Sequence, residues 1–498
     1  MRFSPPYVLA FDVGTTGCKG VLVDSEGLII RKLTKSYPSV VQKTGRLEQD
    51  PLLWWKAVTE IASTILKKIN PTDVSGLGFC GTMAAALPVD KNGRPLRNAM
   101  LYSDVRGTDQ VTRLASEFNA KDVYCLTGNP LSPVYSLSKW MWIRENENKI
   151  FEKTWKFIQP KDFLVHKLTG EIVTDYVDAS ATMAFDVTRR EWAEELLEFA
   201  RIPLDKLPET RSSISIAGEV TSKAAEELRL KKGTPVIVGC GDTAALLAGA
   251  RAVIKGTTTV YLGAAAEIDV TTDRPMFNPR ALIPVRCHAV PNMWFNSASA
   301  MTSGTALRWF VKQFCTEGES YKEMDRKAAK LCPGSDGLIF LPYLSGERMP
   351  IWDSKAKGAF IGISMASSKA HFYRSVLEGV AFSLRSIRDA YLETKIKFEQ
   401  ASISGGGAES SLWKQIVIDV LGFRCDDLAQ PEEASALGVA MYINAALNGK
   451  RHLSEMADKF APIKKTRHPN REKTAEYDRL YKIYSRCYPA LKEITHQL

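Results

Sequence analysis

Short apolar runs of strand length alternate with longer amphipathic stretches along the first half of the chain. The strand-like runs, rich in β-branched and aromatic residues, are residues 7–11, 28–33, 76–80 and 86–89. Residues 52–69 and 109–118 instead repeat apolar positions at helical spacing. Strands interleaved with helices of this length predict an α/β architecture.

The opening pattern is repeated near the middle of the sequence. Residues 257–262 (TTTVYL) form a β-branched and aromatic run that ends at Gly263, and a second strand-like run follows at residues 266–270. The first apolar run of the chain also ends in a glycine-containing turn, and residues 20–24 then resemble the second strand of a hairpin. This echo predicts two related α/β halves.

The boundary between the two halves is expected near residues 250–256, after a buried strand, a glycine turn and the small-residue helix 243–250. We therefore predict an N-terminal domain over residues 1–253 and a C-terminal domain over residues 254–498. No low-complexity linker separates them, so they should pack closely. Clefts between domains are favoured ligand sites.

Length and composition are those of a globular protein with more than one core. The chain has 498 residues, of which 45% are hydrophobic and 24% charged. No stretch approaches the roughly 20 uncharged apolar residues that span a bilayer, and residues 1–6 are too short and polar for a signal peptide. We expect a cytoplasmic protein without a membrane partner.

Cysteine spacing and charge exclude several other classes. The nine cysteines are dispersed without a CxxC pair, which favours reduced thiols over a disulfide framework or a zinc site. The net charge of +10 is spread along the chain, and its densest basic run, residues 464–471, is best interpreted as a solvated loop. We expect no nucleic-acid partner, whereas small anionic substrates would benefit from this field.

Candidate chemistry begins at residues 11–19, FDVGTTGCK, where the first apolar run ends. A carboxylate at Asp12 followed by Gly14, Thr15 and Thr16 provides a Mg²⁺ anchor, a bare backbone and two hydroxyls, as a nucleoside triphosphate tail requires. The same residues also fit an Asp/Gly hairpin turn. The run is neither a Walker A loop nor a GxGxxG dinucleotide turn.

A second glycine-rich segment, residues 404–414, follows a short strand at residues 400–403 and opens a predicted helix over residues 411–421. Consecutive glycines before a helix N-terminus let backbone amides approach a ligand and direct the helix dipole at it. The bare pattern is also compatible with a flexible turn.

Together these segments resemble the FGGY family of carbohydrate kinases, with the xylulokinase-like branch most similar, over essentially the whole length. The supporting blocks are DVGTTGCK (residues 12–19), SPVYSLSKWMWIREN (132–146), PKDFLVHKLTGE (160–171), GCGDTAALLAG (239–249), LPYLSGERMP (341–350), EGVAFSLR (378–385) and SGGGAESSLWKQ (404–415). The resemblance implies two actin-like, RNase H-like ATPase domains with an interdomain cleft. It also implies transfer of the γ-phosphate of ATP to a sugar hydroxyl with Mg²⁺.

The resemblance assigns roles to individual positions. Asp242 matches the catalytic base, although a helix N-cap is the alternative for an isolated aspartate there, and Asp12 matches the carboxylate that holds Mg²⁺. The implied ATP-binding positions are Gly14, Thr15, Thr16, Lys19, Gly263, Gly304, Arg308, Gly406, Gly407 and Ser411. The implied sugar-binding positions are Met83, Tyr102, Asp104, Arg106, Asp242 and Thr243. For Asp104 and Arg106 an ordinary surface ion pair is the competing interpretation, and residues 433–438 match a helix packed behind the nucleotide.

Two departures from the family pattern bear on function. The second phosphate loop usually contains hydroxyl residues, whereas this chain has Gly263 followed by three alanines. Xylulokinases usually carry Met-His-Gly where this chain has Met83-Ala84-Ala85, so a polar group toward the sugar is missing.

The predicted function is ATP-dependent phosphorylation of a ketopentose such as xylulose. The alternatives are another ketose or polyol (ribulose, glycerol or erythritol) and a nucleotide-binding pseudokinase. Dimers are common among similar kinases, so a homodimer is one expected assembly, but no stretch of this sequence identifies an interface.

Overall fold

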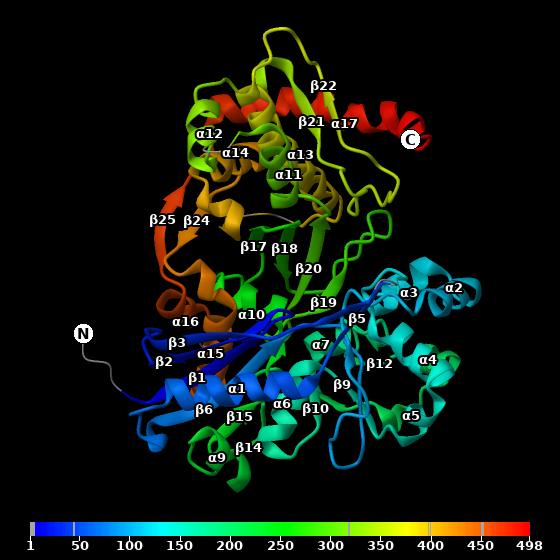
Figure 1. Cartoon of the computed structure of the whole chain (residues 1–498), viewed down its shortest axis with the longest axis vertical. Coiled ribbons are helices and arrows are strands. Elements are labelled where there is room, and N and C mark those ends of the chain that lie inside the picture. The colour runs from blue at the N-terminus through cyan, green and yellow to red at the C-terminus, as the bar shows by residue number, and fades with distance from the viewer. Residues whose placement is uncertain (1–4, 43–44, 317–318, 397, 399, 450–452) are drawn as a thin grey trace.

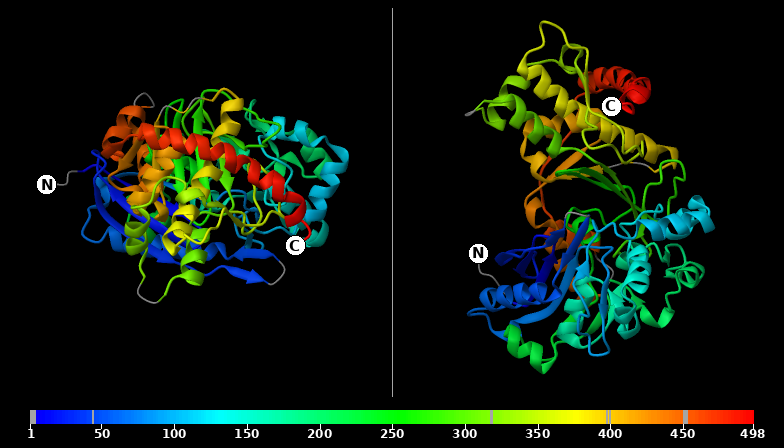
Figure 2. Two further views of the ribbon diagram at one scale, coloured as in Figure 1. Left: turned by 90° about the horizontal axis from the view of Figure 1, so that it is seen from above. Right: turned by 45° about the vertical axis from the view of Figure 1, so that its right-hand side comes forward.

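The computed structural model describes residues 5–42, 45–316, 319–396, 398, 400–449 and 453–498. The chain folds into two α/β lobes, one built around each of two large sheets (Figure 1). Figure 2, on its right, shows the two lobes from the side, with the C-terminal helix α17 (Arg471–Thr495) at the far end of the second lobe.

The first sheet has the strand order β14-β15-β6-β1-β2-β3, with β16 also paired to β6. Its strands are β1 (Tyr7–Val13), β2 (Gly17–Val23), β3 (Ile29–Ser36), β6 (Val74–Gly81), β14 (Ile216–Glu219), β15 (Pro235–Ile237) and β16 (Cys240–Gly241). β1 and β2 form an antiparallel hairpin, and β6 lies parallel to β1 on its other side. Because β1 and β16 both run parallel to β6, the residues that follow them, in the glycine-containing turn and helix α10, lie at one edge of the sheet.

The second sheet has the order β19-β20-β18-β17-β23-β24-β25. Its strands are β17 (Thr257–Leu262), β18 (Ala266–Thr272), β19 (Val285–Cys287), β20 (Trp294–Ala300), β23 (Gln400–Ser404), β24 (Cys425–Leu428) and β25 (Ile463–Arg467). Here β17 and β18 form the hairpin, and β23 lies parallel to β17. The two sheets therefore share their central topology, which confirms the echo in the sequence and the actin-like α/β fold class.

Helices surround both sheets. In the first half they are α1 (Pro51–Ile65), α2 (Thr108–Glu117), α3 (Ala120–Thr127), α4 (Ser136–Asn146), α5 (Asn148–Lys153), α6 (Pro160–Thr169), α7 (Tyr176–Ser180), α8 (Glu194–Ala200), α9 (Ser222–Leu228) and α10 (Asp242–Gly249). In the second half they are α11 (Gly304–Phe314), α12 (Tyr321–Ala328), α13 (Lys369–Glu393), α14 (Ser411–Leu421), α15 (Ala434–Asn448), α16 (Leu453–Phe460) and α17. Among the residues that the structure describes, no helix combines the length and apolar character needed to span a membrane.

Small sheets of two or three short strands complete the lobes. They are β4 (Val40–Gln42) and β8 (Ala99–Met100) on either side of β5 (Arg46–Gln49), β7 (Leu87–Val89) with β9 (Lys156–Ile158), β10 (Val173–Asp175) with β13 (Glu209–Arg211), β11 (Phe185–Asp186) with β12 (Glu191–Trp192), and β21 (Ile339–Leu341) with β22 (Ala359–Ile361).

Local signals set several element ends. Asp50 caps α1 by accepting a hydrogen bond from the Leu52 amide at 2.9 Å, and the helix ends at Ile65, earlier than its amphipathic pattern predicts.

Helices α10 and α15 pack against each other where the two lobes meet. α15 lies in the second half of the sequence but packs on β1 and β6 of the first sheet and on α10, within one buried apolar cluster. A Cβ at Gly249 would lie 1.8 Å from the carbonyl oxygen of Ala434, and one at Gly438 would lie 1.9 Å from that of Ala245. Glycine at both positions therefore permits the close crossing, which fixes the N-terminus of α10 between the two sheets.

Candidate active site

Two cavities adjoin each other between the lobes, and a third, lined by residues of the second half, adjoins one of them. A cavity of about 300 Å³ and one of about 720 Å³ share Asp242, Thr243 and Glu267 among their lining residues. A third, of about 690 Å³, shares Tyr261 and Gly406 with the second. We call them the inner, middle and outer cavities. Asp242 thus stands where the inner and middle cavities meet.

Asp242 is the first residue of α10 and follows β16 directly. Its Oδ1 accepts hydrogen bonds from the Thr243 amide at 2.7 Å and from Thr243 Oγ1 at 3.3 Å. Burial, with repulsion from Asp12 and Glu267, raises the pKa of Asp242 to about 7. Gly241, and not Asp242, is the N-cap of α10, so the N-cap interpretation of Asp242 does not hold.

Asp12 lies at the end of β1 and lines the middle cavity together with Asp242. Burial raises its pKa, while a 3.4 Å hydrogen bond from Cys80 Sγ and the charge of Lys19 lower it. A cation bound beside Asp12 would stabilise its ionised carboxylate and so offset the effect of burial on the pKa of Asp12. One carboxylate fits Mg²⁺, which keeps most of its water ligands. No cluster of three or more metal-ligating side chains exists in the described part of the chain.

The turn after β1 meets the expectations only in part. Gly14 lines the middle cavity, but Thr15 lines the inner one, and the exposed Thr16 lines none of the three. Lys19 also lines none, because its Nζ donates to the Glu432 carbonyl at 2.6 Å and lies 3.0 Å from Glu433 Oε2. Thr16 and Lys19, both predicted to bind ATP, therefore have no counterpart in these cavity walls.

All of the residues that line the outer cavity belong to the second half. Its lining includes the predicted residues Gly263, Gly304, Arg308, Gly406 and Gly407.

Helix α11 begins at this outer cavity. The Gly304 amide donates to the Gly263 carbonyl at 2.8 Å, and a Cβ at Gly304 would lie 2.6 Å from that oxygen. The first turn of α11 is thereby held against the loop formed by Gly263 and the three alanines after it. The N-terminus of a helix attracts anionic groups.

Ser411, which was predicted to bind ATP, is not among the residues that line this cavity. The side chain of Ser411 is exposed, and the neighbouring Ser410 lines the cavity instead. Ser410 caps α14 by accepting a hydrogen bond from the Trp413 amide at 3.0 Å, which turns its side chain toward the helix start. Tyr261 was not predicted from the sequence, yet it lines both the middle and the outer cavities.

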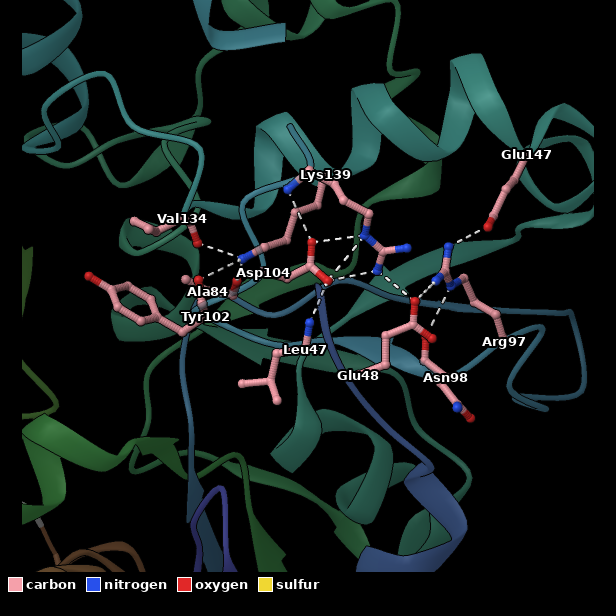
Figure 3. Close-up of polar contacts among 11 residues, drawn as sticks. Leu47, Glu48, Ala84, Arg97, Asn98, Tyr102, Asp104, Val134, Lys139 and Glu147 are labelled. Atoms are coloured by element: carbon pink, nitrogen blue, oxygen red, sulfur yellow. Dashed lines mark hydrogen bonds and ion pairs between the residues drawn. The ribbon is translucent and has the colours of Figure 1, made fainter. Parts of the chain in front are cut away.

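The inner cavity contains four of the six predicted sugar-binding residues: Met83, Tyr102, Asp242 and Thr243. Asp104 and Arg106 do not line it. Their side chains pair with each other, at 2.7 Å between Arg106 Nη2 and Asp104 Oδ2, within a buried network that includes Glu48 and Arg97 (Figure 3). The ion-pair interpretation is therefore the right one for their contacts, except that the pair is buried and not on the surface.

The sequence interpretation missed residues of the second half that complete the inner cavity. They are Glu267, Pro284, Arg286, Ser297, Ser299, Arg348, Met349 and Trp352. Arg286 is engaged, because it donates to Asn129 Oδ1 at 2.6 Å. The Arg348 guanidinium donates no hydrogen bond to any residue that the structure describes, and its charge lowers the pKa of Glu267, which burial raises to about 7. Alternation along β18 could have shown that Glu267 and Asp269 share a face, but not that this face meets the cleft.

A pair of actin-like domains with a carboxylate between two adjoining cavities defines the class of two-lobed phosphotransferases. Comparisons with known proteins agree with this class. Residues 7–249 match the N-terminal domain of the FGGY family of carbohydrate kinases, and residues 252–447 match its C-terminal domain. The chain belongs to the FGGY family of carbohydrate kinases, which are ATP-dependent phosphotransferases.

Individual relatives cover almost the whole chain. It is 30% identical to the xylulose kinase of Lactococcus lactis, over 99% of this chain and 98% of that protein. It is 29% identical to the gluconokinase of Bacillus subtilis, over 90% of each. Among solved structures, the xylulose kinase of Rhodospirillum rubrum superposes with a TM-score of 0.91 at 27% identity, covering 98% of this chain and 100% of that one.

Proposed function

We propose that this kinase phosphorylates a hydroxyl of a ketopentose such as xylulose, with the acceptor in the inner cavity and ATP in the middle and outer cavities. The observation that carries the proposal is the position of Asp242, which lines the inner and middle cavities at once. The similarity to xylulose kinases over the full length supports the choice of acceptor.

In the proposed reaction, Asp242 accepts the proton of the acceptor hydroxyl while that oxygen attacks the γ-phosphorus of ATP. The new O–P bond forms as the bond from the γ-phosphorus to the bridging oxygen breaks, and ADP leaves. Because phosphoryl transfer depends mostly on positioning and charge neutralisation, one well-placed base is sufficient. Closure of the cleft would keep water from acting as the acceptor.

Asp12 is the residue that would hold Mg²⁺ through its water ligands, with Gly14 beside it in the middle cavity. When bound, the ion would neutralise charge on the phosphates. The arrangement also supports a working kinase over a pseudokinase, because both Asp12 and Asp242 are present and close enough for Asp12 to raise the pKa of Asp242.

A second acceptor class is favoured by the position of Arg348 and by the name of one relative. Arg348 lines the inner cavity without a hydrogen-bonded acceptor among the described residues, and one relative is named a gluconokinase. A guanidinium readily binds a carboxylate, so an aldonate such as gluconate is the alternative substrate.

A substrate panel tests both choices. ADP release is measured with D-xylulose, D-ribulose, glycerol, erythritol and gluconate, each with and without Mg²⁺. We expect the highest kcat/KM with D-xylulose and no turnover without the metal. A preference for gluconate would move the assignment to the aldonate class. ADP release that no member of the panel stimulates would overturn the proposed function and favour a pseudokinase.

The raised pKa of Asp242 predicts how the rate depends on pH. Asp242 accepts a proton only when ionised, and its pKa is raised from about 3.8 to about 7. Activity is therefore lost as pH falls through this value, and kcat/KM should drop about tenfold for each pH unit below it. This loss forms the acidic limb of the pH profile, and measurement of kcat/KM from about pH 6 to about pH 8 tests that limb.

The variant Glu267→Gln is the control for that limb. The Glu267 carboxyl has a similar pKa, of about 7, and its charge helps to raise that of Asp242. In the variant the limb should persist and move slightly to lower pH. A limb that disappears in Glu267→Gln would assign it to Glu267 instead.

A further inference from the structure

A fully buried lysine lies directly behind the inner cavity. Lys139 on α4 has no exposed surface and forms no ion pair with any carboxylate that the structure describes. Its Nζ donates to the carbonyl oxygens of Val134 at 2.5 Å and Ala84 at 2.7 Å, and more weakly to that of Tyr102 at 3.5 Å. Burial lowers its pKa to about 7, against the charge of Asp104, which raises it.

The three residues whose carbonyls accept these hydrogen bonds all line the inner cavity, whereas Lys139 itself does not. They come from three separate segments of the chain, which the ammonium group draws together (Figure 3). The protonated amine has three N–H donors and no acceptor, so three carbonyls match the capacity of the charged form of Lys139. Lys139 thus fastens three parts of one cavity wall from behind.

One of these segments has a backbone that needs support. Ala84 has a φ of +57°, in the left-handed region that an L-residue with a Cβ rarely adopts. The next residue is also held, because Gln159 Oε1 accepts from the Ala85 amide at 2.9 Å and Ser136 Oγ donates to the Ala85 carbonyl at 2.7 Å. Such a conformation persists only where its surroundings fix it, and Lys139 bonds the strained residue itself.

We propose that Lys139 is a positioning residue for the phosphoryl acceptor. It sets the distance between the Ala84 turn, Tyr102 and Val134, and so fixes the width of the inner cavity without touching the acceptor. This inference rests on the proposed function, since it takes the inner cavity as the acceptor site. It concerns only this cavity, because none of the three bonded residues lines the middle or outer cavity.

The test compares Lys139→Met with Lys206→Met. Lys206 is a matched control in the same half, because its Nζ also donates to two backbone carbonyls, those of Phe151 at 3.1 Å and Thr154 at 2.5 Å, but it lines none of the three cavities. With the acceptor that the wild-type protein uses best in the panel, Lys139→Met should raise KM for that acceptor about tenfold or more. KM for ATP should change less than about twofold in both variants.

A second variant covers the case in which Lys139→Met does not fold. Adding Ala84→Gly removes the left-handed strain, so Lys139→Met/Ala84→Gly should recover soluble protein while KM for the acceptor stays raised. The inference is overturned if KM for the acceptor stays within about twofold of wild type in the variant that folds, or if Lys206→Met raises it equally.

A readout without turnover separates this inference from the proposed function. Amide hydrogen exchange in peptides covering residues 82–86 should become faster in Lys139→Met and stay unchanged in Lys206→Met. If the wild-type protein phosphorylates no panel member, the proposed function fails, and the exchange measurement still decides whether Lys139 holds the cavity wall. Unchanged exchange in Lys139→Met would overturn that role.

Discussion

Asp242→Asn is expected to reduce kcat for sugar phosphorylation about 10³-fold, because it removes the proton acceptor and keeps the size of the side chain. The folded protein should be at least as stable as wild type near neutral pH. The pKa of this acid is raised by folding, so its ionised form opposes folding above the unfolded-state pKa, and a neutral amide lacks this penalty. ADP release in a coupled assay, with thermal unfolding in parallel, measures both effects.

Asp24→Asn serves as the control for Asp242→Asn. Asp24 is also buried, but its Oδ1 accepts from the amides of Glu26 and Leu28 in a turn after β2, and it lines none of the three cavities. Its variant should keep wild-type kcat. Sugar phosphorylation at the wild-type rate in Asp242→Asn would show that the base has been assigned to the wrong residue.

Lys161→Met is expected to lower the free energy of unfolding by about 3–5 kcal/mol, because it leaves buried carboxylates without their cation. Lys161 Nζ lies 2.5 Å from Asp162 Oδ1, 3.2 Å from Asp175 Oδ1 and 3.3 Å from Asp178 Oδ2, and all four side chains are buried. The cluster lies behind the strand that leads to Asp242, where a Cβ at Gly239 would be 3.5 Å from Lys161 Cδ. Urea unfolding followed by circular dichroism measures the loss.

The exposed Lys232 provides the comparison for Lys161→Met. Lys232→Met should change the free energy of unfolding by less than about 0.5 kcal/mol. A loss below about 1 kcal/mol in Lys161→Met, in the range of a surface ion pair, would mean that the cluster contributes little to stability.

Much of the fold follows from local patterns. The predicted strand at residues 257–262 and the predicted helix at residues 411–421 have the observed bounds of β17 and α14. A β-branched run bounded by glycine, or an apolar helical stripe with a serine cap, carries its own boundary signals. α15 shows the limit of this approach. Its sequence shows that α15 is apolar on most sides, but not that it packs on β1 and β6 of the first sheet.

The same contrast holds for the site. Asp12 and Asp242 could be found because Asp12 lies at the end of one buried strand and Asp242 follows another, each in a short, recognisable block. The family resemblance implied that Asp104 and Arg106 bind the sugar. Their side chains instead form an ion pair with each other, and Arg106 also pairs with Glu48. A sequence block fixes which residues are near one another along the chain, while hydrogen-bond partners from other segments decide where a charged side chain points.

Local patterns in the amino-acid sequence predict several of the strands and helices, the repeat of the opening hairpin, and the two candidate aspartates Asp12 and Asp242. These features depend on the spacing of apolar residues and on short-range turn chemistry. Two features are visible only in the folded structure: the residues of the second half that complete the inner cavity, such as Glu267 and Arg348, and the position of Lys139 behind the wall of that cavity. The physical reason is that a cavity wall is made by side chains and carbonyls from distant segments, whose approach is set by the packing of the two lobes.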